Sequence, residues 1–221
     1  MHQDSGSSRA KRRRRKASET ASQTDGRVVR GQRVRESIVR AMLELFEDGN
    51  LRPTTAEIAA RADVSLRALF NHFKDNDALI AAAFKLQAER EARFEPIPIP
   101  PDRPLDERIA AFAHERAAAL EKMTPYRRAA NAFEPFSREV SEGLHRARER
   151  TRKQIDQVFE PELAALPAPQ RREVLAMLVV ACSWPSWDTL RTTMHLNPAQ
   201  GCAVTTDLLH RILDPLGKQS R

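Results

Sequence analysis

The sequence has few of the residues on which secreted and metal-binding proteins depend. Among 221 residues there are two cysteines and seven glycines. Neither Cys182 nor Cys202 has a second cysteine or a histidine at metal-ligand spacing, so no metal site is expected. We expect both thiols to be small buried side chains in a reducing cytosol. The scarcity of glycine beside 30% charged residues favours helices over sheets.

Long apolar runs and catalytic patterns are also missing. No segment approaches the roughly 18 apolar residues that cross a bilayer. The charged N-terminus lacks the apolar stretch of a signal peptide, so a cytoplasmic protein without a membrane partner is expected. The six histidines form no HExxH pattern, and no glycine-rich phosphate loop is present. We therefore expect neither an enzyme nor a bound cofactor.

The positive charge is concentrated at the N-terminus. Residues 1–30 hold nine basic and three acidic side chains, a net +6, whereas the other 191 residues carry 28 basic and 27 acidic ones. Residues 1–26 lack periodic apolar positions and are predicted to form a disordered basic arm. Such an arm attracts nucleic acid non-specifically, although a solvated, localising tail is the alternative. The expected DNA contacts of the arm are Lys11, Arg12, Arg13, Arg14 and Arg15.

Four helices are predicted between residues 34 and 86. The first has apolar residues at helical spacing and ends at Asp48-Gly49-Asn50. The second opens at Thr54, which with Glu57 matches a capping box. The fourth begins at Asp75 or Asn76. Short helices joined by a tight turn, with a helix on either side, have the proportions of a helix-turn-helix.

The third helix, from a Ser65 cap to about His72, has one apolar and one polar face. Leu69 and Phe73 lie four residues apart and should face the core. The exposed positions are Leu66, Arg67, Ala68 and Asn71. An Arg can pair with guanine and an Asn with adenine, while small apolar groups can touch a thymine methyl. The second helix of a helix-turn-helix enters the major groove, so this face is a candidate DNA-reading surface.

The C-terminal part is predicted to be helical as well. Residues 95–104 contain five prolines and should form a connector. Beyond it we expect helices over 105–123, 137–159, 174–194 and 198–213, with a short broken segment at 125–136 and a linker at 161–169. The body is therefore predicted to be all-α.

The stretch TTAEIAARADVSLRALFNHFKDNDALIAAAF resembles the N-terminal signature of the tetracycline-repressor-like (TetR) family of bacterial transcription regulators. The match covers about residues 34–86. Asp63 stands where the family usually has Gly, Asn76 where it has Lys, and Phe70 where it has Tyr, and the last two changes remove phosphate contacts. The expected DNA-binding residues of the body are Thr54, Thr55, Ser65, Leu66, Arg67, Ala68, Phe70, Asn71, His72 and Lys74.

The resemblance also implies a domain organisation and a mechanism. It implies a three-helix DNA-binding domain over 27–75 and a helical effector-binding and dimerisation domain over 76–221. A homodimer would bind a palindromic operator as a repressor, and a small apolar effector would release it. The expected dimer contacts are Leu178, Val179, Leu190, Val204, Leu208 and Ile212, with the alternative, expected for some of them, that they belong to the core of their own chain. The expected pocket residues are Phe112, Met123, Tyr126, Phe133, Phe136, Met177, Trp184 and Trp187, although aromatic and Met side chains at helical spacing more often belong to a core.

The rival interpretation is an architectural nucleic-acid-binding protein that uses the basic arm, with the helical body as a scaffold. Such a protein would bind unrelated duplexes with similar affinity, and that affinity would fall steeply with salt. A repressor would instead prefer one palindrome over random DNA by roughly 10³-fold or more.

Overall fold

The computed structural model describes residues 29–92 and 98–217. The basic arm and part of the proline-rich connector lie outside the described residues. Within these two ranges all regular structure is helical and no strand occurs, which confirms the all-α prediction. No described helix is both long enough and apolar enough to cross a membrane.

Contacts divide the chain into two compact units. The first comprises the described residues through Leu45 together with Pro53–Ala83, and the second comprises Phe46–Arg52 together with the residues from Phe84 onward. The boundary is crossed twice within helices, near the end of the first helix and in the middle of α4.

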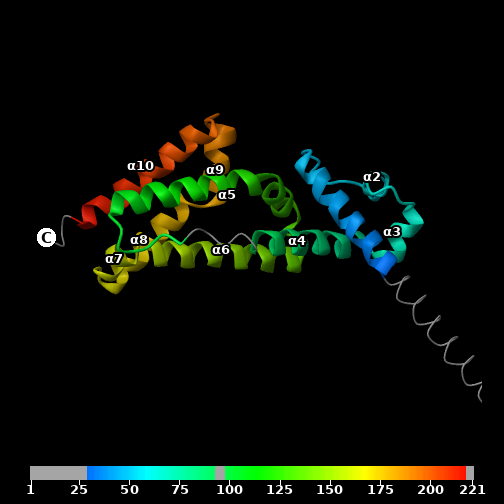
Figure 1. Ribbon diagram of the computed structural model, residues 1–221, viewed down its shortest axis with the longest axis horizontal. Coiled ribbons are helices and arrows are strands. Elements are labelled where there is room, and N and C mark those ends of the chain that lie inside the picture. Colours follow the sequence, from blue (N-terminus) through cyan, green and yellow to red (C-terminus); the bar gives the residue numbers. More distant parts are fainter. Residues whose placement is uncertain (1–28, 93–97, 218–221) are drawn as a thin grey trace, which may run out of the picture. The chain divides into compact units, whose positions relative to one another are not determined.

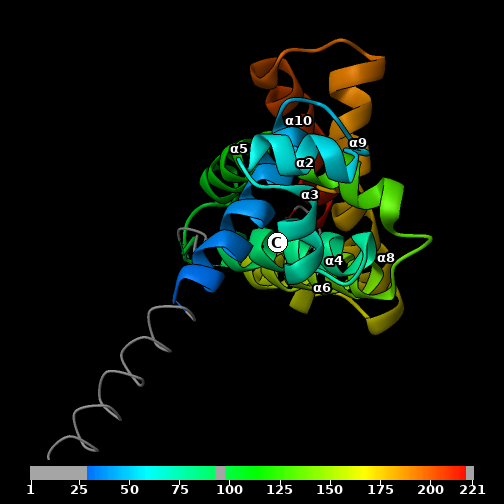
Figure 2. The same cartoon turned by 90° about the vertical axis from the view of Figure 1, so that its right-hand side faces the viewer.

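The first unit is built from the first helix (residues 29–47), α2 (Thr55–Arg61), α3 (Leu66–His72) and the beginning of α4 (Asn76–Ala92), as Figures 1 and 2 show. Its core side chains are almost completely buried and come from all four helices. They include Ile38, Met42, Ile58, Leu69, Phe73 and Leu79. The predicted inward positions of α3, Leu69 and Phe73, are therefore confirmed.

The second unit contains the longer helices. They are α5 (Leu105–Phe133), α6 (Arg138–Val158), α7 (Glu160–Ala164), α8 (Ala168–Ala181), α9 (Trp184–Asp188), the π-helical turn η1 (Thr189–Thr193) and α10 (Pro198–Gly217). In Figure 1, α10 lies along α5, and α6 packs against α8. The main core lies among these helices, where the rings of Phe112 and Phe159 meet edge to face with their centroids 5.5 Å apart.

One buried ion pair ties α5 to α7 within this core. Arg108 donates to both carboxylate oxygens of Glu162 and also to the Val158 carbonyl at 2.8 Å. A bidentate pair of this kind satisfies the guanidinium that burial would otherwise leave uncompensated.

The prediction of a broken segment after Met123 is wrong. Helix α5 runs without interruption through Pro125 to Phe133. Proline removes one backbone donor from a helix, but the turns on both sides are anchored by burial of Leu120, Ala129 and Ala130. Packing on both sides therefore outweighs the cost of the missing hydrogen bond.

The predicted linker at 161–169 is also wrong in part. Pro161 lies in the first turn of α7, and Pro169 lies in the first turn of α8. No backbone N–H is needed at these positions, so a proline there begins a helix instead of preventing one. In the same way, Ser183 caps α9 and Pro185 lies in its first turn, which divides the predicted 174–194 helix into α8, α9 and η1.

Candidate functional site

The turn between α2 and α3 is defined by local interactions. The Glu57 amide donates to Thr54 Oγ1 at 3.2 Å, and the Thr54 amide donates to Glu57 Oε2 at 2.7 Å, so the predicted capping box is confirmed. Asp63 has a φ of 53°, a left-handed conformation that Asp adopts more readily than most residues. Ser65 caps α3 by accepting from the Ala68 amide at 3.1 Å. Each such cap stabilises its helix by about 1 kcal/mol.

The outward face of α3 is polar and exposed. The side chains of Arg67 and Asn71 are exposed, and Phe70 is 50% exposed. On the opposite side, the Arg35 guanidinium lies 4.7 Å from the centroid of the buried Phe73 ring. A cation over a ring face adds to the apolar packing that holds this helix. The rest of the predicted set is placed as follows: Leu66 and Ser65 are exposed, and Ala68 and His72 are half-buried.

The predicted DNA-binding residues outside α3 differ in their exposure and in their hydrogen bonds. The Thr54 hydroxyl donates to Glu57 at 2.7 Å, so its hydrogen is committed to the capping box, whereas Thr55 is half-buried in the first turn of α2. Lys74 is highly exposed and lies 3.4 Å from Asp75. Asp75 caps α4 through the Ala78 amide at 2.8 Å, and this hydrogen bond holds the pKa of the Asp75 carboxyl below its ordinary value.

The described part of the first unit carries almost no net charge. Residues 29–45 and 53–83 hold seven basic and six acidic side chains. A surface that binds a polyanion gains most of its salt-dependent affinity from excess cations. Residues 1–26, which lie outside the described residues, hold seven basic and three acidic side chains, a net +4 of the chain's net +7.

A cavity lies in the second unit between α4, α5 and α6. Its volume is about 60 Å³, room for about four water molecules. Its lining mixes small apolar residues with charged and amide groups: Phe84, Gln87, Ala88, Glu91, Met123, Tyr126, Arg127, Ala130, Val140, Gly143, Leu144, Ala147 and Arg150.

Aromatic rings and one polar contact border this cavity. The Phe84 ring stacks on Phe46 with centroids 5.5 Å apart, and Phe133 lies 6.4 Å from both. The Tyr126 phenol donates to a carboxylate oxygen of Glu47. Burial, together with that hydrogen bond, raises the pKa of Tyr126 above its ordinary value. The cavity wall therefore includes a residue that is hydrogen-bonded to the end of the first helix.

The predicted pocket residues are divided between the cavity and other places. Met123 and Tyr126 line the cavity, and Phe133 packs on its bordering rings. Phe112 belongs to the main core, whereas Phe136 is 78% exposed and Met177 is exposed. The two tryptophans belong to a smaller core cluster with Leu120.

The two tryptophans are held by α5 and α10. Trp184 donates through Nε1 to Thr124 Oγ1 at 3.2 Å, and Trp187 donates to Glu121 Oε2 at 3.0 Å. The Trp187 ring lies so close to Gly201 that a Cβ there would be 3.1 Å from it. The two tryptophans are expected in the pocket because they are aromatic. Large aromatic side chains also fill cores, and these two lie in a core.

Sequence reasoning missed most of the cavity lining. Gln87, Arg127 and Arg150 are polar, and Ala88, Ala130, Gly143 and Ala147 are small, so none belongs to the aromatic and Met side chains expected in a pocket. The spacing of Val140, Leu144 and Ala147 on one face of α6 was the available signal.

The predicted dimer residues lie on α8, η1 and α10. Leu178 is fully buried in the main core of its own chain, so its side chain cannot reach a partner. Leu208 is exposed, and the remaining four are half-buried: Val179, Leu190, Val204 and Ile212. Exposed apolar side chains also occur at Met177 and at Val180, which is 64% exposed.

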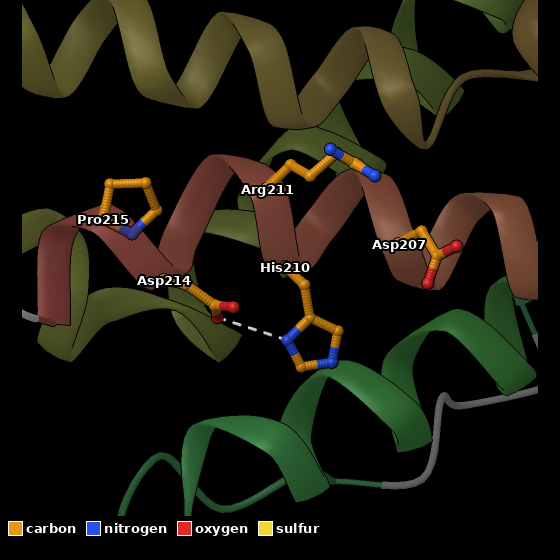
Figure 3. A pocket seen from close by; sticks show the side chains of 5 residues that line it. All are labelled: Asp207, His210, Arg211, Asp214 and Pro215. Carbon is orange, nitrogen blue, oxygen red and sulfur yellow. Dashed lines mark hydrogen bonds and ion pairs between the residues drawn. The ribbon is translucent and has the colours of Figure 1, made fainter.

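An open hollow lies along one side of α10 (Figure 3). It is lined by Asp207, His210, Arg211, Asp214 and Pro215, and the close-up shows His210 directed toward Asp214 while Arg211 points away. The His210 Nδ1 lies 3.2 Å from Asp214 Oδ1 and 3.9 Å from Asp106 Oδ1. These three residues bring ligand-type atoms within 4.8 Å of one another, a spacing that a metal ion could use. Both carboxylates are exposed, as is common in carboxylates that bind no ion.

The chain is similar to known proteins in one part of its sequence and in its fold. The family model described as bacterial regulatory proteins, tetR family, matches residues 38–83. No curated protein matches the chain in sequence. A transcriptional regulator from Rhodococcus sp. Rha1 has a TM-score of 0.61 at 17% identity, covering 82% of this chain and 96% of that one. A protein of Pseudomonas aeruginosa PAO1, described as a candidate transcriptional regulator, has a TM-score of 0.60 at 15% identity, covering 85% and 93%.

The matched residues 38–83 contain the capped α2, the Asp63 turn and the exposed face of α3. The two solved structures share the all-helical fold over most of the chain. Residues 38–83 are therefore similar in sequence to tetR-family bacterial regulatory proteins, and most of the chain is similar in fold to two solved structures.

Proposed function

We propose that the protein is a dimeric transcriptional repressor that binds a palindromic operator and leaves it when a small molecule binds. The observation that carries this proposal is the arrangement of α3. Its Ser65 cap and the buried Leu69 and Phe73 hold the helix in place, while Arg67 and Asn71 project from the other face. A rigid helix with free polar side chains is what reading base edges requires.

In this proposal the residues of α3 have separate tasks. Arg67 pairs with a guanine and Asn71 with an adenine, the bidentate partners that suit these side chains. Leu66 and Ala68 lie near the beginning of the helix, where a thymine methyl can be contacted. Phe70, His72 and Lys74, with Thr54, Thr55 and Ser65, position the helix against the sugar-phosphate backbone.

A dimer is needed because one seven-residue helix reads too few base pairs. We place the interface on the outer faces of α8 and α10, where Val179, Val204, Leu208 and Ile212 are half-buried or exposed. Met177 and Val180 join this surface because both are exposed. An interface covering them would remove apolar area from water, and its two-fold axis would place two α3 helices about 34–36 Å apart, one turn of DNA.

The effector site in this proposal is the cavity between α4, α5 and α6. Tyr126 lines the cavity and is hydrogen-bonded to Glu47 at the end of the first helix. Helix α4 begins in the first unit and carries Gln87 and Glu91 into the lining. A ligand that changes the position of α4 or Tyr126 therefore acts on residues of the DNA-binding unit's own helices.

Selection of bound sequences from random duplexes tests the proposal, with the full-length protein at fixed salt. The expected outcome is an inverted repeat with half-sites one helical turn apart, bound by a dimer in sedimentation experiments. Similar affinity for unrelated duplexes, with no repeat, would instead support the architectural protein that uses its basic arm.

A further inference from the structure

A residue that lines the cavity between α4, α5 and α6 has a buried acceptor without a donor. Gln87 is only 8% exposed and lines the cavity. Its Nε2 donates to Glu91 Oε1 at 3.2 Å, whereas its Oε1 has no hydrogen-bond partner among the described residues. A buried acceptor that has lost water and gained no partner is unfavourable. A bound molecule that donates a hydrogen bond would remove this penalty.

The same cavity contains a cation without a counter-ion. Burial lowers the pKa of the Arg127 guanidinium, and the carboxylate of Glu91 opposes that effect only in part. The polar contact of Arg127 is a long one, 4.0 Å from Nη2 to Met123 Sδ. Within residues 29–92 and 98–217, no carboxylate oxygen lies within ion-pair distance of it. An anionic ligand group would therefore be stabilised at Arg127.

The charged residues around the cavity also favour an anionic ligand. The lining holds two guanidinium groups, those of Arg127 and Arg150, against the single carboxylate of Glu91. Arg116 lies three helical turns before Arg127 on the same side of α5. It donates from Nε to the Cys182 carbonyl at 2.9 Å, and burial lowers its pKa to about 10. The potential in this region favours an anion and opposes a cationic ligand.

We propose that the effector is a small organic monoanion, a carboxylate that also carries a hydroxyl group. The carboxylate pairs with Arg127, and the hydroxyl donates to Gln87 Oε1. The apolar body of the molecule lies against the small side chains of the wall, Ala88, Ala130, Val140, Leu144 and Ala147. This inference depends on the proposed effector site, and it replaces an apolar effector with an amphiphilic acid.

Calorimetry of the full-length protein without DNA tests the proposal. The probes are small hydroxy acids such as glycolate and lactate, which suit a cavity with room for about four water molecules. Each is compared with its neutral amide and with the acid that lacks the hydroxyl. At least one hydroxy acid should bind roughly 10- to 100-fold more tightly than its amide, since charge-assisted hydrogen bonds are the strong ones. If no acid binds more tightly than its amide, the proposal is overturned.

Substitutions locate the binding. Arg127→Gln should abolish the preference for acid over amide, and Gln87→Leu should abolish the preference for the hydroxylated acid. Arg127→Lys retains the charge and should retain the acid preference, which guards against a simple folding defect. Arg146→Gln removes an exposed arginine of α6 that does not line the cavity and should change neither preference. An acid preference that survives Arg127→Gln would refute the assignment to this cavity.

Different results would refute the DNA-binding function and the ligand assignment. If a palindrome is selected but no acid binds, the ligand assignment is wrong and the DNA-binding function stands. If an acid binds at Arg127 but leaves operator affinity unchanged, the ligand assignment stands and release by that effector is wrong.

Discussion

The Tyr126 phenol in α5 is hydrogen-bonded to the carboxylate of Glu47, the last residue of the first helix. The two residues are 79 positions apart in the sequence. Tyr126 also lines the cavity, so one side chain borders the cavity and is hydrogen-bonded to the last residue of the first helix.

We expect Tyr126→Phe to lower the free energy of unfolding by about 0.5–1.5 kcal/mol, the net contribution of one hydrogen bond. Urea denaturation measures this loss. In a double-mutant cycle, Glu47→Ala should cost much less in the Tyr126→Phe background than alone. Costs that add to within about 0.3 kcal/mol would show that the pair does not interact.

The left-handed conformation of Asp63 predicts the order of stability among variants at this position. Asp63 has a φ of 53°, so Asp63→Gly and Asp63→Asn should leave stability nearly unchanged, because both residues tolerate this conformation. Asp63→Ala should destabilise the protein by about 1–2 kcal/mol. Thermal unfolding monitored by circular dichroism checks the order. Equal stability of the Ala and Asn variants would contradict a conformational role.

Arg67→Ala should cost about 1–3 kcal/mol of operator affinity and relax the preference at one base pair in each half-site. Binding measured on a set of single-base operator variants tests this. Lys74→Ala is the control, since loss of a phosphate contact should weaken binding to every variant about equally. Uniform weakening by Arg67→Ala as well would make Arg67 another phosphate contact.

Deleting residues 1–26 should reduce the salt dependence of DNA binding and leave site preference largely intact. Each lost phosphate contact should reduce the slope of log K against log salt by about 0.9. Replacing Lys11–Lys16 with glutamines in the full-length chain is the matched control, because it removes charge without shortening the arm. A changed preferred sequence in either variant would mean that the arm reads bases.

Glu115 predicts a pH dependence of stability. Its Oε2 is buried without a partner among the described residues, and burial raises the pKa of this carboxyl above its ordinary value. The folded protein therefore favours the protonated form, and the stability that this group contributes at low pH is lost as pH rises through the raised pKa.

It follows that Glu115→Gln should raise the urea midpoint at pH 7, and the gain should disappear below about pH 4, the ordinary range of a Glu carboxyl. Glu173→Gln, at an exposed position of α8, should leave the midpoint unchanged at both pH values. A gain that is independent of pH would exclude the ionisation of Glu115 as its cause.

The features that the sequence predicted correctly are local ones. The Thr54–Glu57 box, the Ser65 cap and the Asp63 turn depend on residues within a few positions of one another, and each appears as predicted. The course of α5 through Pro125 and the presence of α7 depend instead on side chains buried by distant helices, such as Ala130 and Leu163. Local rules place a break at those prolines because they contain no information on that burial.

The cavity was predicted less well for a related reason. Aromatic residues are expected in a ligand wall because they suit one, but Phe112 and Trp187 fill cores. Gln87 and Arg127 are candidate ligand-binding residues only because three helices bury them. Burial leaves the Gln87 acceptor unpaired and lowers the pKa of the Arg127 guanidinium, and the sequence alone does not show that burial.

The position of the two tryptophans gives the protein a selective optical reporter. Both lie in α9, where Trp187 is wedged between Glu121 and Gly201, and the chain has no other tryptophan. Indole emission therefore reports on the junction of α5, α9 and α10 alone. Unfolding of the first unit alone would leave this emission unchanged, whereas circular dichroism would register it. A comparison of the two signals in one melt can thus measure whether the two compact units unfold together.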